Sequence, residues 1–185
     1  MKTILFLTFF ISYVSANGQI EYNGVKYNKM TQVMGTNYVI ATFKDSSKKA
    51  VYNNRLLFIN TSTNEKKKID FPSNVYFDKI EQVKIDNLGI NKILIAAKTD
   101  YVGKDRFIDM RERPTKILIL STDGQEKTQL TADSLFVSSW AINNQDGSIF
   151  IRGYYDINKN GKNDKADKSE ELLFDLKTLM VKLNR

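Results

Sequence analysis

The segment QVKIDNLGINKILIAAKTD, residues 82–100, aligns without a gap on SSWAINNQDGSIFIRGYYD, residues 138–156. In each, an alternating strand leads through a turn rich in Asn and Gly into a second, more apolar strand that ends on aspartate. A third copy of the second strand, YVIATFKD at 38–45, aligns in the same way on ILIAAKTD at 93–100. The repetition indicates several similar structural units along the chain.

The rest of the chain follows the same period of two. The stretch IEYNGVKY, residues 20–27, places Asn-Gly between two short alternating runs, which predicts a hairpin. Similar apolar runs are separated by Asn, Asp, Gly and Ser, and no stretch has the period of an amphipathic helix. We therefore expect an all-β, mostly antiparallel fold, with further strands at YVIATF, RLLFIN, EKKKID, EQVKID, KILIAAK, KILILST, EKTQL, LFVSSWAIN, SIFIRGYY, ELLFDL and LMVKLN.

A unit of about 55 residues with four consecutive antiparallel strands resembles a β-propeller blade. The resemblance implies units at approximately 31–70, 79–130 and 135–183, although no Trp-Asp blade signature is present. Because propellers close with about four to eight blades, three units imply an open arc or a homo-oligomer that closes by association. The hairpin at 20–27 and the strand at 179–184 are expected to cap the sheet edges, or two chains to pair edge to edge. A β-sandwich or barrel of the same meanders is the alternative.

Residues 1–16 have the pattern of an export signal. Lys2 precedes the apolar run ILFLTFFISYV at 4–14, and VSA at 14–16 has small residues where a signal peptidase cuts. The run is about half the roughly 20 residues that cross a bilayer, so we expect a cleaved peptide and not a retained helix. This predicts a signal peptide at 1–16 and one domain at 17–185, secreted or periplasmic, without membrane insertion after cleavage.

Composition excludes several kinds of chemistry. The chain has no cysteine and no histidine, so disulfides, thiolate zinc sites, thiol nucleophiles and histidine-based triads are absent. The net charge is +7, from 28 Lys and Arg against 21 Asp and Glu. The lysines are scattered through turns and not gathered with aromatic residues, so no nucleic-acid partner is expected.

The loop DINKNGKND, residues 156–164, resembles the calcium loops of EF-hands, dockerins and some propeller blades. Where an EF-hand has a bidentate glutamate, this chain has a shorter aspartate, and strands flank the loop. Neighbouring lysines reduce its charge, so we expect Ca²⁺ binding in the range of roughly 0.1 to 1 mM. An ordinary metal-free turn is the alternative. The resemblance implies side-chain ligands at Asp156, Asn158, Asn160 and Asp164, a carbonyl ligand at Lys162, the sharp turn at Gly161, and Asp167 at the last ligand position.

Equivalent units would place Asp45, Asp100 and Asp156 along one rim, each opening a polar loop. Such loops are where repeat folds commonly bind ligands, although aspartate also begins turns for purely local reasons. Trp140 shares strand parity with Phe136 and Ile142, which predicts a core position.

Two classes of function follow. The first is a calcium-stabilised binding module that contacts a protein or glycan through its rim loops. The second is a carboxylate-based hydrolase of extracellular glycans, which requires two acidic groups about 5 to 10 Å apart. Asp100 and Asp109 are its best candidates. No nucleophile motif accompanies them, so we do not expect an enzyme.

Overall fold

A computed structural model describes residues 21–22, 25–43, 55–72, 75–99, 113–160 and 163–182. The predicted signal peptide and several residues singled out above, namely Asp45, Asp100, Asp109, Gly161 and Lys162, lie outside the described residues. The described residues form strands and one short 3₁₀ helix, Asp86–Leu88. The all-β prediction is therefore confirmed. None of the described residues belongs to a helix long and apolar enough to span a membrane.

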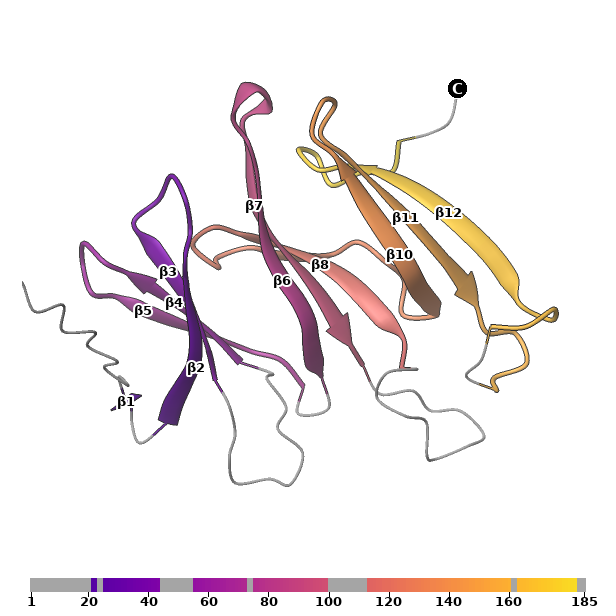
Figure 1. Ribbon diagram of the computed structural model, residues 1–185, viewed down its shortest axis with the longest axis horizontal. Coiled ribbons are helices and arrows are strands. Elements are labelled where there is room, and N and C mark those ends of the chain that lie inside the picture. Colours follow the sequence, from indigo (N-terminus) through magenta and orange to yellow (C-terminus); the bar gives the residue numbers. More distant parts are fainter. Residues whose placement is uncertain are drawn as a thin grey trace, which may run out of the picture.

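The strands form three antiparallel sheets that stand side by side (Figure 1). In each sheet the strands follow one another in chain order, and consecutive strands pair antiparallel. Sheet 1 contains β1 (Glu21–Tyr22), β2 (Val25–Gln32), β3 (Tyr38–Phe43), β4 (Arg55–Asn60) and β5 (Lys66–Asp70); sheet 2 contains β6 (Tyr76–Ile85), β7 (Ile90–Lys98), β8 (Thr115–Ser121) and β9 (Lys127–Gln129); sheet 3 contains β10 (Leu135–Asn143), β11 (Ser148–Tyr155) and β12 (Lys168–Asp175).

The pairing predicted for the first and last strands of the chain is found only at the first. The strand pairing of the predicted hairpin is confirmed, since Tyr22 pairs with Val25 and β1 flanks β2; the Asn-Gly pair itself lies outside the described residues. The last predicted strand is reduced to a single bridge between Phe174 and Val181, closed by the Lys182 N–H on the Leu173 carbonyl at 2.7 Å. Sheet 3 thus has three strands, and the four-stranded blade is not seen there.

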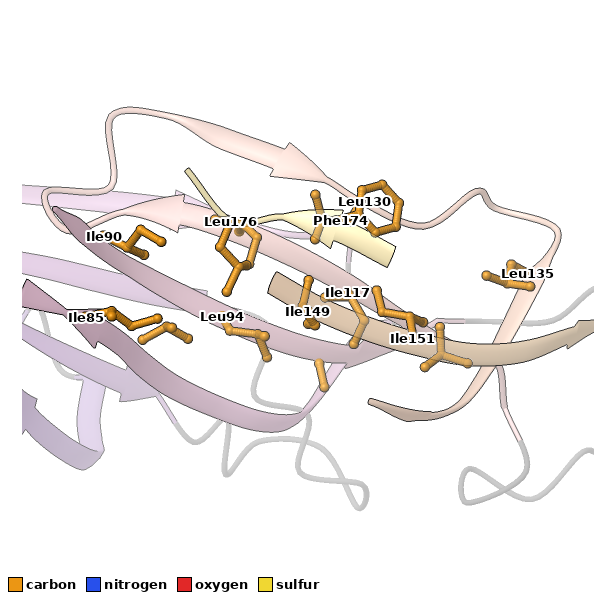
Figure 2. Packing of buried hydrophobic residues seen from close by; sticks show 14 residues of the cluster. Ile85, Ile90, Leu94, Ile117, Leu130, Leu135, Ile149, Ile151, Phe174 and Leu176 are labelled. Atoms are coloured by element: carbon orange, nitrogen blue, oxygen red, sulfur yellow. The ribbon is translucent and has the colours of Figure 1, made fainter. Parts of the chain in front are cut away.

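Sheet 2 is the central layer and is buried on both faces. On β7, Ile93 and Ile95 pack toward sheet 1, whereas Leu94 and Ala96 pack toward sheet 3. All four are at most 1% exposed. Figure 2 shows the second of these interfaces, where Leu94 and Ile117 of sheet 2 meet Ile149 and Ile151 of sheet 3. A strand covered on both sides needs an unbroken apolar run, which explains KILIAAK and KILILS.

One strand of each sheet, namely β2, β6 and β10, carries an irregularity in register at the corresponding place. The shift falls between Tyr27 and Lys29 in β2, between Phe77 and Lys79 in β6, and between Val137 and Ser139 in β10. A β-bulge adds one residue to one strand and so reverses the face of every residue beyond it. The first pairs after the shift are Lys29–Thr42, Lys79–Ala96 and Ser139–Arg152.

These pairs make Ala96 the counterpart of Thr42, whereas the sequence alignment sets Thr42 against Ala97. A slip of one position places aligned side chains on opposite faces. The aligned residues Ile40 and Ile95 show this effect. Ile40 of sheet 1 faces the following sheet, sheet 2, whereas Ile95 of sheet 2 faces the preceding sheet, sheet 1. The alignment of β7 with β11 keeps the faces, since its aligned residues Ile93 and Ile149 both face the preceding sheet.

The bulge in β10 also corrects the assignment of Trp140. Trp140 pairs with Ile151 and packs against the core together with Ile142, as expected. Phe136 precedes the bulge and lies on the opposite face, where its ring centroid is 5.1 Å from that of Tyr154. The predicted common parity of Trp140 and Phe136 is therefore wrong, because the extra residue in the strand has no sequence signature.

Candidate metal centre

The candidate calcium loop joins the last two strands of sheet 3. β11 ends at Tyr155 and β12 begins at Lys168, and these two residues pair with each other. The loop between them therefore begins and ends at one point on the sheet. Its length leaves enough chain to curl its alternate residues inward, which is the arrangement that a calcium loop requires.

Asp164 is the centre of the loop's hydrogen-bond network. Its Oδ2 accepts the side-chain amides of Asn158 at 2.9 Å and Asn160 at 2.7 Å, and its Oδ1 accepts the Ala166 N–H at 2.8 Å. These donors, the Ala166 N–H foremost, hold the pKa of Asp164 below its usual value. Asp164 is therefore an anion at neutral pH, and two predicted ligand residues already point at it.

Asp156 joins the same network from the other side. Its Oδ1 accepts the Asn160 N–H at 3.1 Å, and the Asn158 Oδ1 accepts that same N–H at 3.1 Å. The four side chains that the sequence predicted as ligands, Asp156, Asn158, Asn160 and Asp164, thus form one connected group.

Asp167 closes the loop. Its Oδ1 accepts the Ile157 N–H at 3.0 Å and its Oδ2 accepts the Asp164 N–H at 2.8 Å. Both carboxylate oxygens therefore hold main-chain groups from the two ends of the loop. This structural role was not anticipated from the sequence, and it follows from the short aspartate side chain, which reaches the backbone where a glutamate would extend further.

The donor set is weighted toward neutral groups. Within the ranges that the structure covers, no three His, Cys, Asp or Glu side chains form a cluster able to hold a metal. The predicted side-chain ligands are three carboxylates and two amides, but both oxygens of Asp167 accept main-chain N–H groups, which leaves two carboxylates and two amides for an ion. Lys162 lies outside the described residues. For each asparagine to bind a cation, its amide must turn so that Oδ1 replaces Nδ2, a rotation of one side-chain torsion.

A second polar centre was missed from the sequence. Lys116 is only 3% exposed, at the start of the apolar run of β8. Its Nζ donates to the carbonyls of Ala132 at 3.1 Å and Leu135 at 3.0 Å, and also to the Asp133 carbonyl. Burial lowers the pKa of Lys116 to about 8, and the Asp133 charge opposes that shift. Lys116 therefore anchors the segment that links sheets 2 and 3.

Comparison with protein-family models, with curated proteins and with solved structures gives no match. Function is therefore inferred from the chain's own residues.

Proposed function

We propose that the protein is a secreted or periplasmic calcium-binding β-repeat protein that acts as a binding module, contacting a protein or glycan ligand through loops along one rim. The observation that carries the proposal is one connected group, in which Asn158 and Asn160 donate to Asp164 while Asp156 accepts the Asn160 N–H. Calcium is a hard ion that takes six to eight oxygen ligands in flexible geometry. Because the four side chains are already close together, binding an ion requires only that the two amides turn, and little further ordering of the loop.

The affinity is set by charge. Two carboxylates and two amides give a weaker site than the all-acidic loops of cytosolic buffers. A dissociation constant of roughly 0.1 to 1 mM suits an extracellular module. With about 1 mM free calcium, the ion then stabilises the fold by about 0.4 to 1.4 kcal/mol. The role of the ion is thus to fix the loop and not to hold the domain together.

The repeated order of strands in the three sheets supports the proposed ligand-binding rim. The turns β2–β3, β6–β7 and β10–β11 lie at the same end of the three sheets, so β3, β7 and β11 all run toward the opposite end (Figure 1). The common direction of these three strands and the matched register shifts in β2, β6 and β10 favour three equivalent, blade-like units. The ends of β3, β7 and β11 then lie on one side of the three sheets, and the candidate calcium loop follows the third of them; residues 44–54 and 100–112, which follow the first two, lie outside the described residues.

Three such units leave sheet edges and faces uncovered. Phe150 is 41% exposed on the face of sheet 3 that points away from sheet 2. We expect pairing of two chains to cover this face, as edges and apolar faces favour association. Light scattering over a range of concentrations decides this point, and a strict monomer at high concentration argues against it.

Calorimetric titration with calcium tests the metal site, with thermal melting as a second readout. We expect Asp156→Ala and Asp164→Ala to abolish the heat of binding and the calcium-dependent rise in melting temperature. Lys165→Gln is the matched variant, since it removes a positive charge from an exposed loop position and should tighten binding about twofold. Absence of heat and of any calcium-dependent stabilisation in the parent protein would end the metal hypothesis.

A further inference from the structure

A cleft of about 170 Å³ opens between sheets 1 and 2. Its sheet 1 wall includes Lys29, Ile40 and Thr42, and its sheet 2 wall includes Ile80 and Ile93. The floor is apolar, since Ile40 is 5% exposed and Ile93 is 1% exposed. The edge is polar and carries both signs of charge, since Lys29 of β2 lines it together with Asp78 and Glu81 of β6.

The register shifts identify the counterpart of this cleft at the junction of sheets 2 and 3. Lys29 and Lys79 are the first paired residues after the shift in β2 and β6. Ile80 is the second paired residue after the shift in β6, and Trp140 is the second paired residue after the shift in β10. They pair with Ile95 and Ile151, respectively. Since Ile95 and Ile151 both face the preceding sheet, Ile80 and Trp140 occupy the same position in their sheets.

An aromatic ring fills this position between sheets 2 and 3. Trp140 packs against the core that joins the two sheets. The Lys79 Nζ of the preceding sheet lies 5.8 Å from the centroid of the Trp140 ring. This is the geometry of a cation–π contact, in which the ammonium group is attracted to the negative face of the ring.

The position between sheets 1 and 2 also has a lysine, but it has an isoleucine where the other has the tryptophan ring. Lys29 takes the place of Lys79, and Ile80 takes the place of Trp140. An isoleucine side chain is much smaller than an indole, so the cleft opens beside it. The volume is suitable for one aromatic ring, because an apolar cavity of about 150 Å³ accepts benzene.

We propose that this cleft binds an aromatic ring of a ligand, with the ring against Ile80, Ile40 and Ile93 and the Lys29 ammonium group over its face. The chemical class is an indole, phenol or phenyl group, carried by a free small molecule or by the side chain of an extended peptide. The site lies on β2 and β3 of sheet 1 and on β6 and β7 of sheet 2, and the candidate calcium loop belongs to sheet 3. Ring binding therefore does not depend on calcium.

The test uses 5-fluoroindole as the probe and follows its ¹⁹F resonance as the protein is titrated. For a ligand of this size we expect saturable binding with a dissociation constant of about 1 to 10 mM. Ile80→Trp supplies an internal ring and should abolish binding while raising the melting temperature. Ile80→Met is the matched control, since its similar volume leaves the cleft open and should retain binding within about twofold. Chelation of calcium should change neither result.

Two further variants keep the proposal open to refutation if Ile80→Trp does not fold. Lys29→Met should weaken binding about two- to fivefold through loss of the cation–π contact. Trp140→Ile should open the equivalent position between sheets 2 and 3 and raise the stoichiometry from one probe to two. A blocked tripeptide with central tryptophan that binds more tightly than 5-fluoroindole identifies a peptide as the source of the ring, and equal affinity identifies a free small molecule. No saturable binding to the parent, or unchanged affinity in both Ile80→Trp and Lys29→Met, would overturn the proposal.

Discussion

Replacement of Lys116 by methionine tests how the buried ammonium group contributes to stability. Methionine keeps much of the apolar stem and removes the charge and all three donors. The carbonyls of Ala132, Asp133 and Leu135 then lose a partner. Each buried polar group left unpaired costs about 1 to 3 kcal/mol of stability. Part of the total cost for the three carbonyls is offset, because the variant no longer buries a charge. We expect Lys116→Met to lower the free energy of unfolding by about 2 to 4 kcal/mol at pH 7.

The pH dependence gives a sharper test. Burial lowers the pKa of Lys116 from 10.5 to about 8 in the folded protein. Between these values the unfolded chain binds more protons than the folded chain, so the contribution of this group to stability rises with pH. Relative to pH 7, the gain is about 1 kcal/mol at pH 9 and about 2 to 3 kcal/mol at pH 10. Lys116→Met lacks this gain, so the difference between parent and variant should widen as pH rises.

Urea unfolding followed by Trp140 fluorescence at pH 7, 8, 9 and 10 measures this difference directly. Lys177→Met is the control, because Lys177 is exposed and its replacement should leave the difference from the parent constant. A difference for Lys116→Met that stays constant with pH would show that the pKa is not lowered. A difference that narrows would show that the three carbonyl acceptors stabilise the ammonium group more than burial destabilises it.

Three other changes have defined outcomes. Gly124→Ala should cost about 2 to 4 kcal/mol, because φ is +70° and an added Cβ would lie 2.7 Å from the Phe58 ring. Gly89→Ala, at φ +64° with no atom within 4 Å, should cost only about 1 kcal/mol in chemical unfolding, and equal losses would contradict the packing account. Asp167→Asn should lower the calcium-free unfolding free energy by about 1 kcal/mol, since one carboxylate oxygen that accepts a main-chain N–H is lost; an unchanged melting temperature would refute its role in closing the loop. Export predicts an intact mass without residues 1–16, and a retained segment would contradict the predicted signal peptide.

Much of the loop's geometry could be read from the sequence, because a short loop between paired strands is a local structure. Asp156, Asn158, Asn160 and Asp164 are spaced so that a curled chain brings them together, and the structure connects them by hydrogen bonds. The role of Asp167 could not be read in this way. Its bonds depend on the way in which β11 and β12 bring the two ends of the loop together.

The sequence by itself determined the class of fold and most of the strands, because a period of two and turn residues act over short distances. The apolar runs KILIAAK and KILILS predicted strands, and the structure showed that they lie in a central sheet buried on both faces. Only the tertiary structure decided which face meets which sheet. The register shifts that separate Phe136 from Trp140 arise from pairing with another strand. The burial of Lys116 and the opening beside Ile80 likewise depend on residues distant in the chain, because packing between sheets is a non-local property that no single segment encodes.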